Sequence, residues 1–99
     1  MTRLASKVRK IRSKNAGPFW LTIDIFCGEK SIYQDVCDKL SNIDIATVLD
    51  VDETNLKRFE IASLNVLKIS LPRPQIQGSM RDRDMHGAGW AAIIGEMEI

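Results

Sequence analysis

The sequence predicts an α+β sandwich, in which a mostly antiparallel sheet carries helices packed on one face. Residues 19–27 alternate between apolar and mixed positions, which is the pattern of a strand with one face in the core. Apolar residues then recur at helical spacing over 31–40 and again near the carboxyl end, with two further extended segments between these helices. A chain of 99 residues is too short for two independent cores, so one domain over 1–99 is expected.

The first predicted strand is the most hydrophobic segment of the chain. Its odd positions are all apolar, namely Phe19, Leu21, Ile23, Ile25 and Cys27. Gly28 ends the strand, because glycine lowers strand propensity and permits a sharp change of direction. Asp24 falls on the second face, where a charged side chain needs water, a partner or a ligand.

Two helices are predicted after this strand. The first covers 31–40 and begins with Ser31, whose hydroxyl can cap the first turn. The second is short, and either Ser41 or Asn42 can cap it, since Asp44 is favourable in a first turn. Both segments carry a stripe of apolar residues, so we expect each to pack on the sheet.

Two extended segments follow, around 59–61 and 67–71, each with apolar residues at alternate positions. The residues between them, 62–65, are expected to form a hairpin or sharp bend, because Ser63 and Asn65 are common turn residues. A proline directly after the second segment ends it, since proline cannot donate to a ladder of hydrogen bonds.

The last predicted helix has Trp90, Ile93, Ile94 and Met97 at helical spacing, with Asp84 as a candidate amino-terminal cap. The final four residues either end this helix or add a short edge strand. The nearest common architecture for this order of elements is the ferredoxin-like sandwich.

Charge is balanced overall but unevenly placed. The chain has 14 basic and 13 acidic residues, yet every charged residue before Asp24 is basic. These bases are Arg3, Lys7, Arg9, Lys10, Arg12 and Lys14. They fit a solvated segment or an anion-binding contact. Nucleic-acid binding is not expected, because no aromatic residues interleave these bases as a stacking platform requires.

Cys27 and Cys37 match neither a redox motif nor a zinc spacing and occupy apolar positions, so buried free thiols are expected. No window of the sequence approaches the roughly 18 apolar residues of a membrane span, and there is no apolar leader. We therefore expect a reduced, cytoplasmic protein that contacts no membrane. The sequence does not identify a cofactor.

The first candidate site is the turn before the first strand, with Arg12, Ser13, Lys14, Asn15 and Gly17. Arg12 offers a planar fork for a carboxylate or phosphate, and Lys14 offers a point charge. The two neutral side chains can add hydrogen bonds, and the glycine lets the backbone approach closely. This group could hold an anionic head group. The alternative is that the turn is structural and its bases are solvated.

The second candidate site contains Asp82, Asp84 and His86, which project to one side if the segment is extended. Two carboxylates and an imidazole can ligate a divalent metal or act as acid and base. The spacing matches no standard metal signature, and the arginines beside the acids favour structural ion pairs. We therefore assign no metal site here. His86 is the only histidine, so any catalytic imidazole must belong to it.

The third candidate is the polar face that Thr22 and Asp24 form with Lys68 and Ser70 if their strands pair. An ion pair between Asp24 and Lys68 across the sheet is the simpler interpretation. The alternative is a sheet face covered by a partner chain, because large apolar residues fall on the same side. These residues are Trp20, Phe26 and Val66.

Three segments closely resemble the matching parts of a short bacterial family known only as domain-of-unknown-function family 4387. They are "IRSKNAGPFWLTIDIF", "LNVLKISLPRPQIQGS" and "DRDMHGA". The resemblance runs from about Lys7 to Ile94. More distantly, the chain is similar to the carboxy-terminal ferredoxin-fold domain of the acyclic terpene utilisation protein AtuA.

In that more distant domain, an Arg-Ser-Gly-Asp-Lys-Gly turn precedes the first strand, where this chain has residues 12–17. Its Leu-Asn pair resembles residues 64–65, and its Asp-x-x-Gly-Lys helix start resembles the segment that begins at 84. This chain departs from the pattern: Asn15 replaces the aspartate of the turn, and the lysine is displaced to Lys14.

The resemblance implies a small accessory subunit, or partner, of a larger AtuA-like protein that acts in the catabolism of branched or acyclic organic acids or acyl-CoA thioesters. On this hypothesis the chain contributes an anion-binding turn to a shared site for an anionic acyl or organic-acid ligand. The substrate-binding candidates are Arg12, Ser13, Lys14, Asn15, Gly17, Asn65 and Lys68, and the catalytic candidates are Asp84 and His86.

Two alternatives stay open at this point. The chain could be a stand-alone homo-oligomeric enzyme that uses His86 and Asp84 as acid and base on an organic acid. It could also be a non-catalytic structural or ligand-sensing module. Whether the chain is an enzyme at all is not decided by its sequence.

Overall fold

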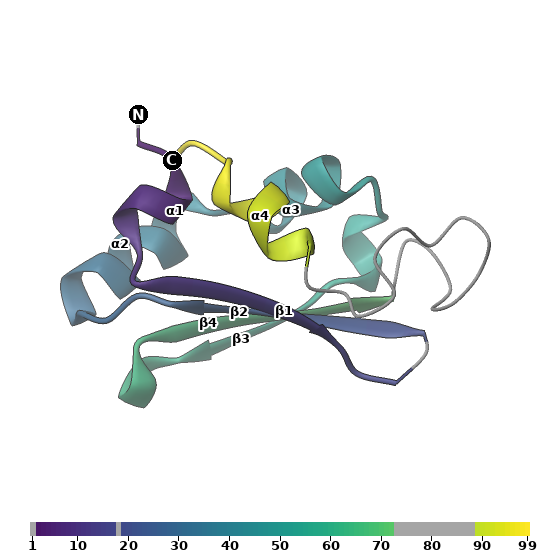
Figure 1. Ribbon diagram of the computed structural model, residues 1–99, viewed down its shortest axis with the longest axis horizontal. Helices are drawn as coiled ribbons and strands as arrows, with labels where there is room; N and C mark the ends of the chain where they lie inside the picture. Colours follow the sequence, from purple (N-terminus) through teal and green to yellow (C-terminus); the bar gives the residue numbers. More distant parts are fainter. Residues whose placement is uncertain (1, 18, 73–88) are drawn as a thin grey trace.

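A four-stranded antiparallel sheet with helices on one face forms the fold (Figure 1). The computed structural model describes residues 2–17, 19–72 and 89–99. The strands are β1 (Lys10–Asn15), β2 (Trp20–Phe26), β3 (Lys57–Ile61) and β4 (Val66–Pro72). The helices are α1 (Leu4–Lys7), α2 (Lys30–Lys39), α3 (Asn42–Leu49) and α4 (Trp90–Gly95), with short 3-10 turns η1 (Glu53–Asn55) and η2 (Ala62–Leu64). The predicted α+β sandwich is confirmed.

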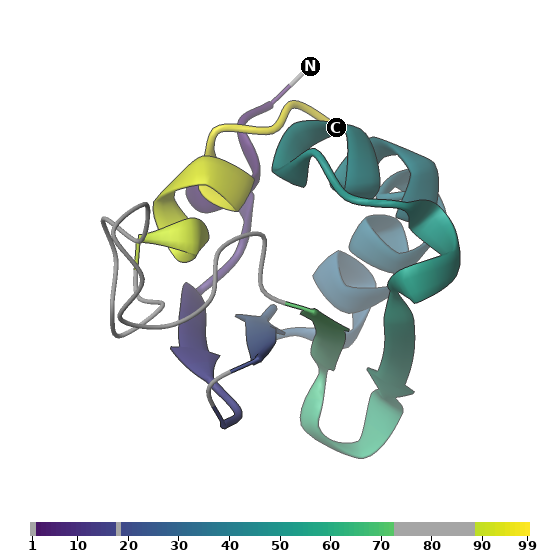
Figure 2. The ribbon, with the colours of Figure 1, turned by 90° about the vertical axis from the view of Figure 1, so that its right-hand side faces the viewer.

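The strands stand in the order β1-β2-β4-β3, seen end-on in Figure 2, and each neighbouring pair is antiparallel. β2 and β3 therefore run parallel with β4 between them, and α2 and α3 connect the two. This is the split βαβ unit of a ferredoxin-like sheet. The remaining edge strand is β1, which precedes this unit in the chain instead of following α4.

The two ends of the described chain lie side by side (Figure 1). Thr2 and Ile99 exchange two backbone hydrogen bonds, of 3.2 and 3.0 Å, and Arg3 forms an isolated antiparallel bridge with Glu98. The last residues consequently pair with the amino-terminal segment and not with an edge of the main sheet.

The prediction of a turn over 12–15 is wrong, because these residues belong to β1. The alternation that marks a strand is present, but it is carried by exposed bases on one face and only one apolar residue, Ile11, on the other. The turn itself comes later. The Ala16 N–H donates to the Trp20 carbonyl at 2.9 Å, and Gly17 has a φ of 82°, which favours glycine.

The core lies between the helices and one face of the two central strands. Ile23 and Ile69 are directly opposite each other in the register of β2 and β4. The sheet contributes Leu21, Ile23, Ile25, Leu67, Ile69 and Leu71, and the helices contribute Leu4, Val36, Leu40, Ile45, Leu49 and Ile94. This burial is the main stabilising term of the fold, because it removes large apolar side chains from water.

The boundaries of α2 and α3 agree with the expected positions to within a residue or two. α1 was not predicted, because its four residues are too few to carry a helical pattern. α4 begins at Trp90 with Gly89 as its cap, and the predicted cap, Asp84, lies outside the described residues. Ser41 caps α3, with its Oγ accepting a hydrogen bond from the Asp44 N–H at 3.1 Å. Ser31 is not a cap, since α2 begins one residue earlier, after Glu29. The predicted bend between the later strands is η2, and Asn65 follows it in the left-handed conformation with a φ of 54°.

An ion-pair cluster joins α1 to α2. The carboxylate of Asp35 contacts the ammonium group of Lys7, and its second oxygen lies 3.2 Å from the Lys39 Nζ. Hydrogen bonds from these two lysines lower the pKa of Asp35 from its ordinary value of 3.8.

Acid is expected to weaken the fold partly through this cluster. A carboxyl whose pKa is lower in the folded than in the unfolded chain stabilises the fold above its ordinary pKa, and this contribution is lost as the pH falls through the folded value. Urea unfolding at pH 7 and pH 3 measures the effect. Asp35→Asn should lower stability at pH 7 and reduce the difference between the two pH values. An unchanged difference would contradict this assignment.

Candidate functional site

One face of the sheet carries no helix of the described chain, and we call it the open face (Figure 1). It is formed by alternate residues of all four strands, because successive side chains of a strand point to opposite sides. One cross-strand row contains Arg12, Asp24, Lys68 and Phe59, in the order of the strands. Another row contains Lys14, Thr22, Ser70 and Lys57.

The open face is basic. Its cations, Lys10, Arg12, Lys14, Lys57 and Lys68, surround a single acid among the described strand residues, Asp24. Asp24 lies opposite Lys68, as expected, but no ion pair within 4 Å joins the two in the described chain. The positive charge of this face is therefore only partly balanced from within.

Aromatic rings stand among these bases. Trp20 and Phe59 are exposed, and the Lys57 Nζ lies 5.3 Å from the centroid of the Trp20 ring. Phe26 is half-buried on the same face. The buried Thr22 hydroxyl has no hydrogen-bond partner within the described part of the chain. The open face therefore combines apolar rings, cations and an unsatisfied hydroxyl.

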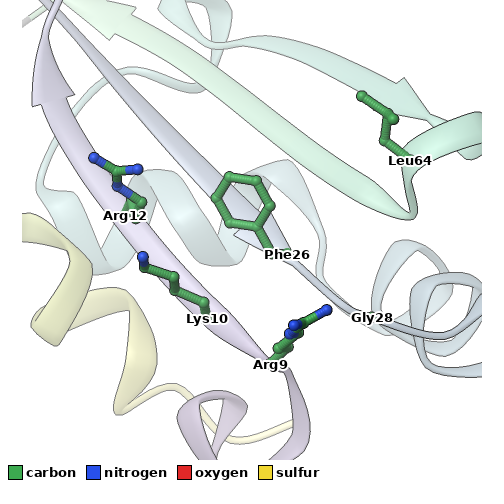
Figure 3. A pocket seen from close by; sticks show the side chains of 6 residues that line it. All are labelled: Arg9, Lys10, Arg12, Phe26, Gly28 and Leu64. Carbon is green, nitrogen blue, oxygen red and sulfur yellow. The ribbon is translucent and has the colours of Figure 1, made fainter.

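One end of the open face is hollowed, and we call this feature the end hollow (Figure 3). Its volume is about 360 Å³, and it is lined by Arg9, Lys10, Arg12, Phe26, Gly28 and Leu64. The three bases come from β1 and the residue before it, while Leu64 comes from η2, on the far side of Phe26. Arg12 and Leu64 belong to two of the three segments that carry the family resemblance.

The structure separates the residues of the first candidate site. Arg12 and Lys14 lie on the open face with Lys68, whereas Ser13 and Asn15 lie on the opposite side of β1. Gly17 is in the turn that follows. These residues thus do not converge on one point, and only the basic ones share a face.

Asn65, another substrate-binding candidate, contributes a main-chain hydrogen bond to the fold. Its carbonyl accepts a hydrogen bond from the Cys27 N–H at 2.9 Å, which ties the start of β4 to the end of β2. Asp82, Asp84 and His86 fall outside the described residues, so the second candidate site stays a prediction. In the described ranges, no group of three metal-ligating side chains gathers.

Both cysteines are free thiols, as expected. Cys27 is buried and Cys37 is half-buried. Burial raises the pKa of the Cys27 thiol to about 11, so it is protonated at neutral pH and a poor nucleophile.

Ser13 connects β1 to α4. Its buried Oγ accepts a hydrogen bond from the Ala91 N–H at 2.9 Å, in the first turn of that helix. The hydroxyl therefore satisfies a backbone donor that a helix start leaves without an internal partner.

Ser13→Ala is expected to lower the free energy of unfolding by about 1 kcal/mol, the usual value of such a contact. Amide exchange should accelerate in α4. Ser41→Ala is the matched control, because it removes a cap of similar strength from α3. Equal acceleration in α3 and α4 for both variants would contradict the specific role of Ser13.

The sequence did not reveal that aromatic rings interleave the bases. The bases are in β1, whereas Trp20, Phe26 and Phe59 are in β2 and β3. Only the pairing of strands brings them onto one face. The sequence offered one signal, the alternation of side chains in each strand. This alternation places Arg12 and Phe26 on the same side of the sheet only when the register of β1 and β2 is also known.

Residues 4–98 match the model of a family described as Domain of unknown function (DUF4387). No curated protein matches the chain, and no solved structure does. Among the helices of the described ranges, none has the length and apolar character that a bilayer span needs. The matched range includes every residue of the open face and of the end hollow.

Proposed function

This chain belongs to the DUF4387 family, and from that premise we propose that it is a small accessory subunit of a larger AtuA-like protein. The pair acts in the cytoplasmic breakdown of branched or acyclic organic acids or acyl-CoA thioesters. The chain docks through its open face and supplies cations to a shared site for an anionic substrate. The association with an AtuA-like protein rests on the resemblance of the sequence, and the mode of docking rests on the geometry.

The observation that carries the proposal is the exposed aromatic surface of the open face. Trp20 and Phe59 carry large exposed rings. Burial of these rings against a second protein would remove apolar surface from water and so favour association. Aromatic residues at the centre of an interface also supply most of its binding free energy.

The charge of the open face specifies the partner surface. Cations flank the exposed rings, with Lys57 beside Trp20 and Lys68 opposite Phe59. The matching surface is therefore an apolar patch with an acidic rim, because complementary charges steer association and reject wrong partners. A second copy of this chain does not offer such a rim on its own open face, where like charges would meet.

The substrate anion is assigned to the cations that remain near the edge of the interface. Arg12 and Lys14 stand on the edge strand β1, outside the exposed rings of β2 and β3. Arginine suits a planar carboxylate or a phosphate, and lysine adds a point charge. Ser13 and Asn15 lie on the other side of β1, so they support this strand and do not contact the same anion.

Co-purification tests the proposal directly. The tagged chain and the untagged AtuA-like protein encoded beside it are expressed together, and a stable complex is expected in gel filtration at physiological salt. A mixture that elutes as two separate species would contradict the proposal. Self-association of the chain alone, without binding to the larger protein, would contradict it as well.

A further inference from the structure

We propose that the end hollow is a binding site for an organic phosphate, meaning a molecule with a phosphate group and a planar aromatic body. The ring of Phe26 stacks on the body, and Arg9, Lys10 and Arg12 hold the phosphate. The inference rests on the proposed function only for the anionic character of the ligand. It does not require the docked partner.

Among the residues that the structure describes, three cations line the end hollow and no acid does. Lys10 and Arg12 lie on one side of Phe26 and Arg9 lies beside Gly28 (Figure 3), so the bases border the hollow from two sides and give it a positive potential that attracts an anion. Asp24, opposite Arg12 on the neighbouring strand, balances at most one of these charges. The two uncompensated charges match a phosphate dianion better than a single carboxylate, and arginine forks bind phosphate through paired hydrogen bonds.

The backbone at Gly28 leaves room for one of these cations. Gly28 has a φ of 84°, and a Cβ at this position would lie 3.4 Å from the Cβ and 3.5 Å from the Cδ of Arg9. A side chain on residue 28 would strain the backbone at this positive φ, and its Cβ would be in ordinary van der Waals contact with the Arg9 stem. Arg9 therefore lies beside Gly28 at the edge of the end hollow (Figure 3).

The apolar part of the end hollow favours a flat ligand. Figure 3 shows the ring of Phe26 with its face turned toward the viewer, between the bases of β1 and Leu64. Leu64 is exposed to solvent, although it is a large aliphatic side chain. Phe26 and Leu64 are the large apolar side chains among the described residues that line the hollow. The volume of about 360 Å³ is within the range of small-molecule sites.

Binding of four probes to the isolated chain tests the inference. Adenosine 5′-monophosphate carries both the phosphate and the planar body, whereas inorganic phosphate and adenosine each carry one. Isovalerate carries a carboxylate on an aliphatic body. Titration calorimetry or amide chemical shifts should give the tightest binding for the monophosphate, by about tenfold over each other probe, because stacking and phosphate contacts add. Isovalerate or inorganic phosphate binding as tightly as the monophosphate would overturn the inference.

Matched variants locate the site. Arg12→Gln should weaken monophosphate binding by about tenfold or more, as expected for a lost charged hydrogen bond. Phe26→Leu should weaken the monophosphate and leave inorganic phosphate unchanged. Lys57→Gln is the control, because it removes a cation from the other end of the open face. Equal losses in Lys57→Gln and Arg12→Gln would indicate non-specific attraction and would overturn the inference.

The outcome is separable from that of the docking experiment. Docking without monophosphate binding would remove only the organic-phosphate site. Monophosphate binding without docking would leave the site in place and remove the accessory-subunit proposal.

Discussion

Arg58→Met is expected to lower the free energy of unfolding by about 3 kcal/mol, because the lost hydrogen bonds come from a charged, largely buried donor. The Arg58 side chain is 16% exposed. Its guanidinium donates to the carbonyls of Leu40 at 2.6 Å and Cys37 at 2.7 Å, where α2 ends. It also donates to the Asn42 Oδ1 at 3.2 Å, where α3 begins.

The expected loss of stability is large because the substitution leaves hydrogen-bond acceptors without a donor. Methionine fills a similar volume but satisfies none of these acceptors, so two carbonyls at the end of a helix lose their partner. For a small domain with a total stability of about 5–15 kcal/mol, the expected loss is large. Thermal and urea unfolding monitored by circular dichroism measure it.

Arg3→Met is the matched control for Arg58→Met. Arg58 pairs with the Glu60 carboxylate at 3.0 Å, and Arg3 likewise pairs with that of Glu96 at 3.2 Å, but the Arg3 side chain is 56% exposed. An exposed ion pair contributes less than about 1 kcal/mol, so this variant should be nearly as stable as the native chain. Similar losses in the two variants would contradict the assigned role of Arg58.

Phe59→Glu is expected to weaken binding to the larger AtuA-like protein by about 30-fold, the effect of losing an aromatic residue that dominates an interface. Phe59 is 48% exposed on the open face, so the change should leave the fold intact. Titration calorimetry measures the affinity, and thermal unfolding verifies the fold.

Ile43→Glu controls for a general effect of an acid on an apolar surface. Ile43 is 60% exposed on α3, in the helical layer on the opposite side of the sheet. Its replacement should leave the affinity unchanged. A loss of binding in Ile43→Glu but not in Phe59→Glu would place the interface on the helices.

The central strands and the longer helices were predictable because each carries its own apolar pattern. β2 alternates strictly through Leu21, Ile23 and Ile25, and β4 does the same through Leu67 and Ile69. These segments need no information from elsewhere in the chain, since their burial follows from local periodicity. The cap of α3 was predictable for the same reason, because Ser41 and the Asp44 N–H that it accepts from are neighbours in the sequence.

β1 was not predictable from local pattern. Lys10, Arg12 and Lys14 give its solvent side the composition of a charged loop, and Ile11 is its only apolar side chain. An edge strand of this kind is stabilised by pairing with β2 and by packing of α4 on its other side. Neither β2 nor α4 can be inferred from the sequence of residues 10–15 alone.

The candidate site was predictable in part. The sequence placed Thr22, Asp24 and Lys68 on one face, and the register confirms it. The end hollow was not predicted, since Arg9 and Leu64 are more than fifty residues apart and meet only through strand pairing. The same holds for Arg58, whose helix-end partners lie 18 and 21 residues earlier in the chain.

Docking through the open face is the central claim, and cross-saturation NMR on the labelled chain with the unlabelled AtuA-like protein tests it most directly. Saturation of the larger protein should attenuate signals of residues at the contact. We predict attenuation at Trp20, Phe59 and Lys68, on the open face. Attenuation confined to α2 and α3, with these three residues unaffected, would contradict the claim.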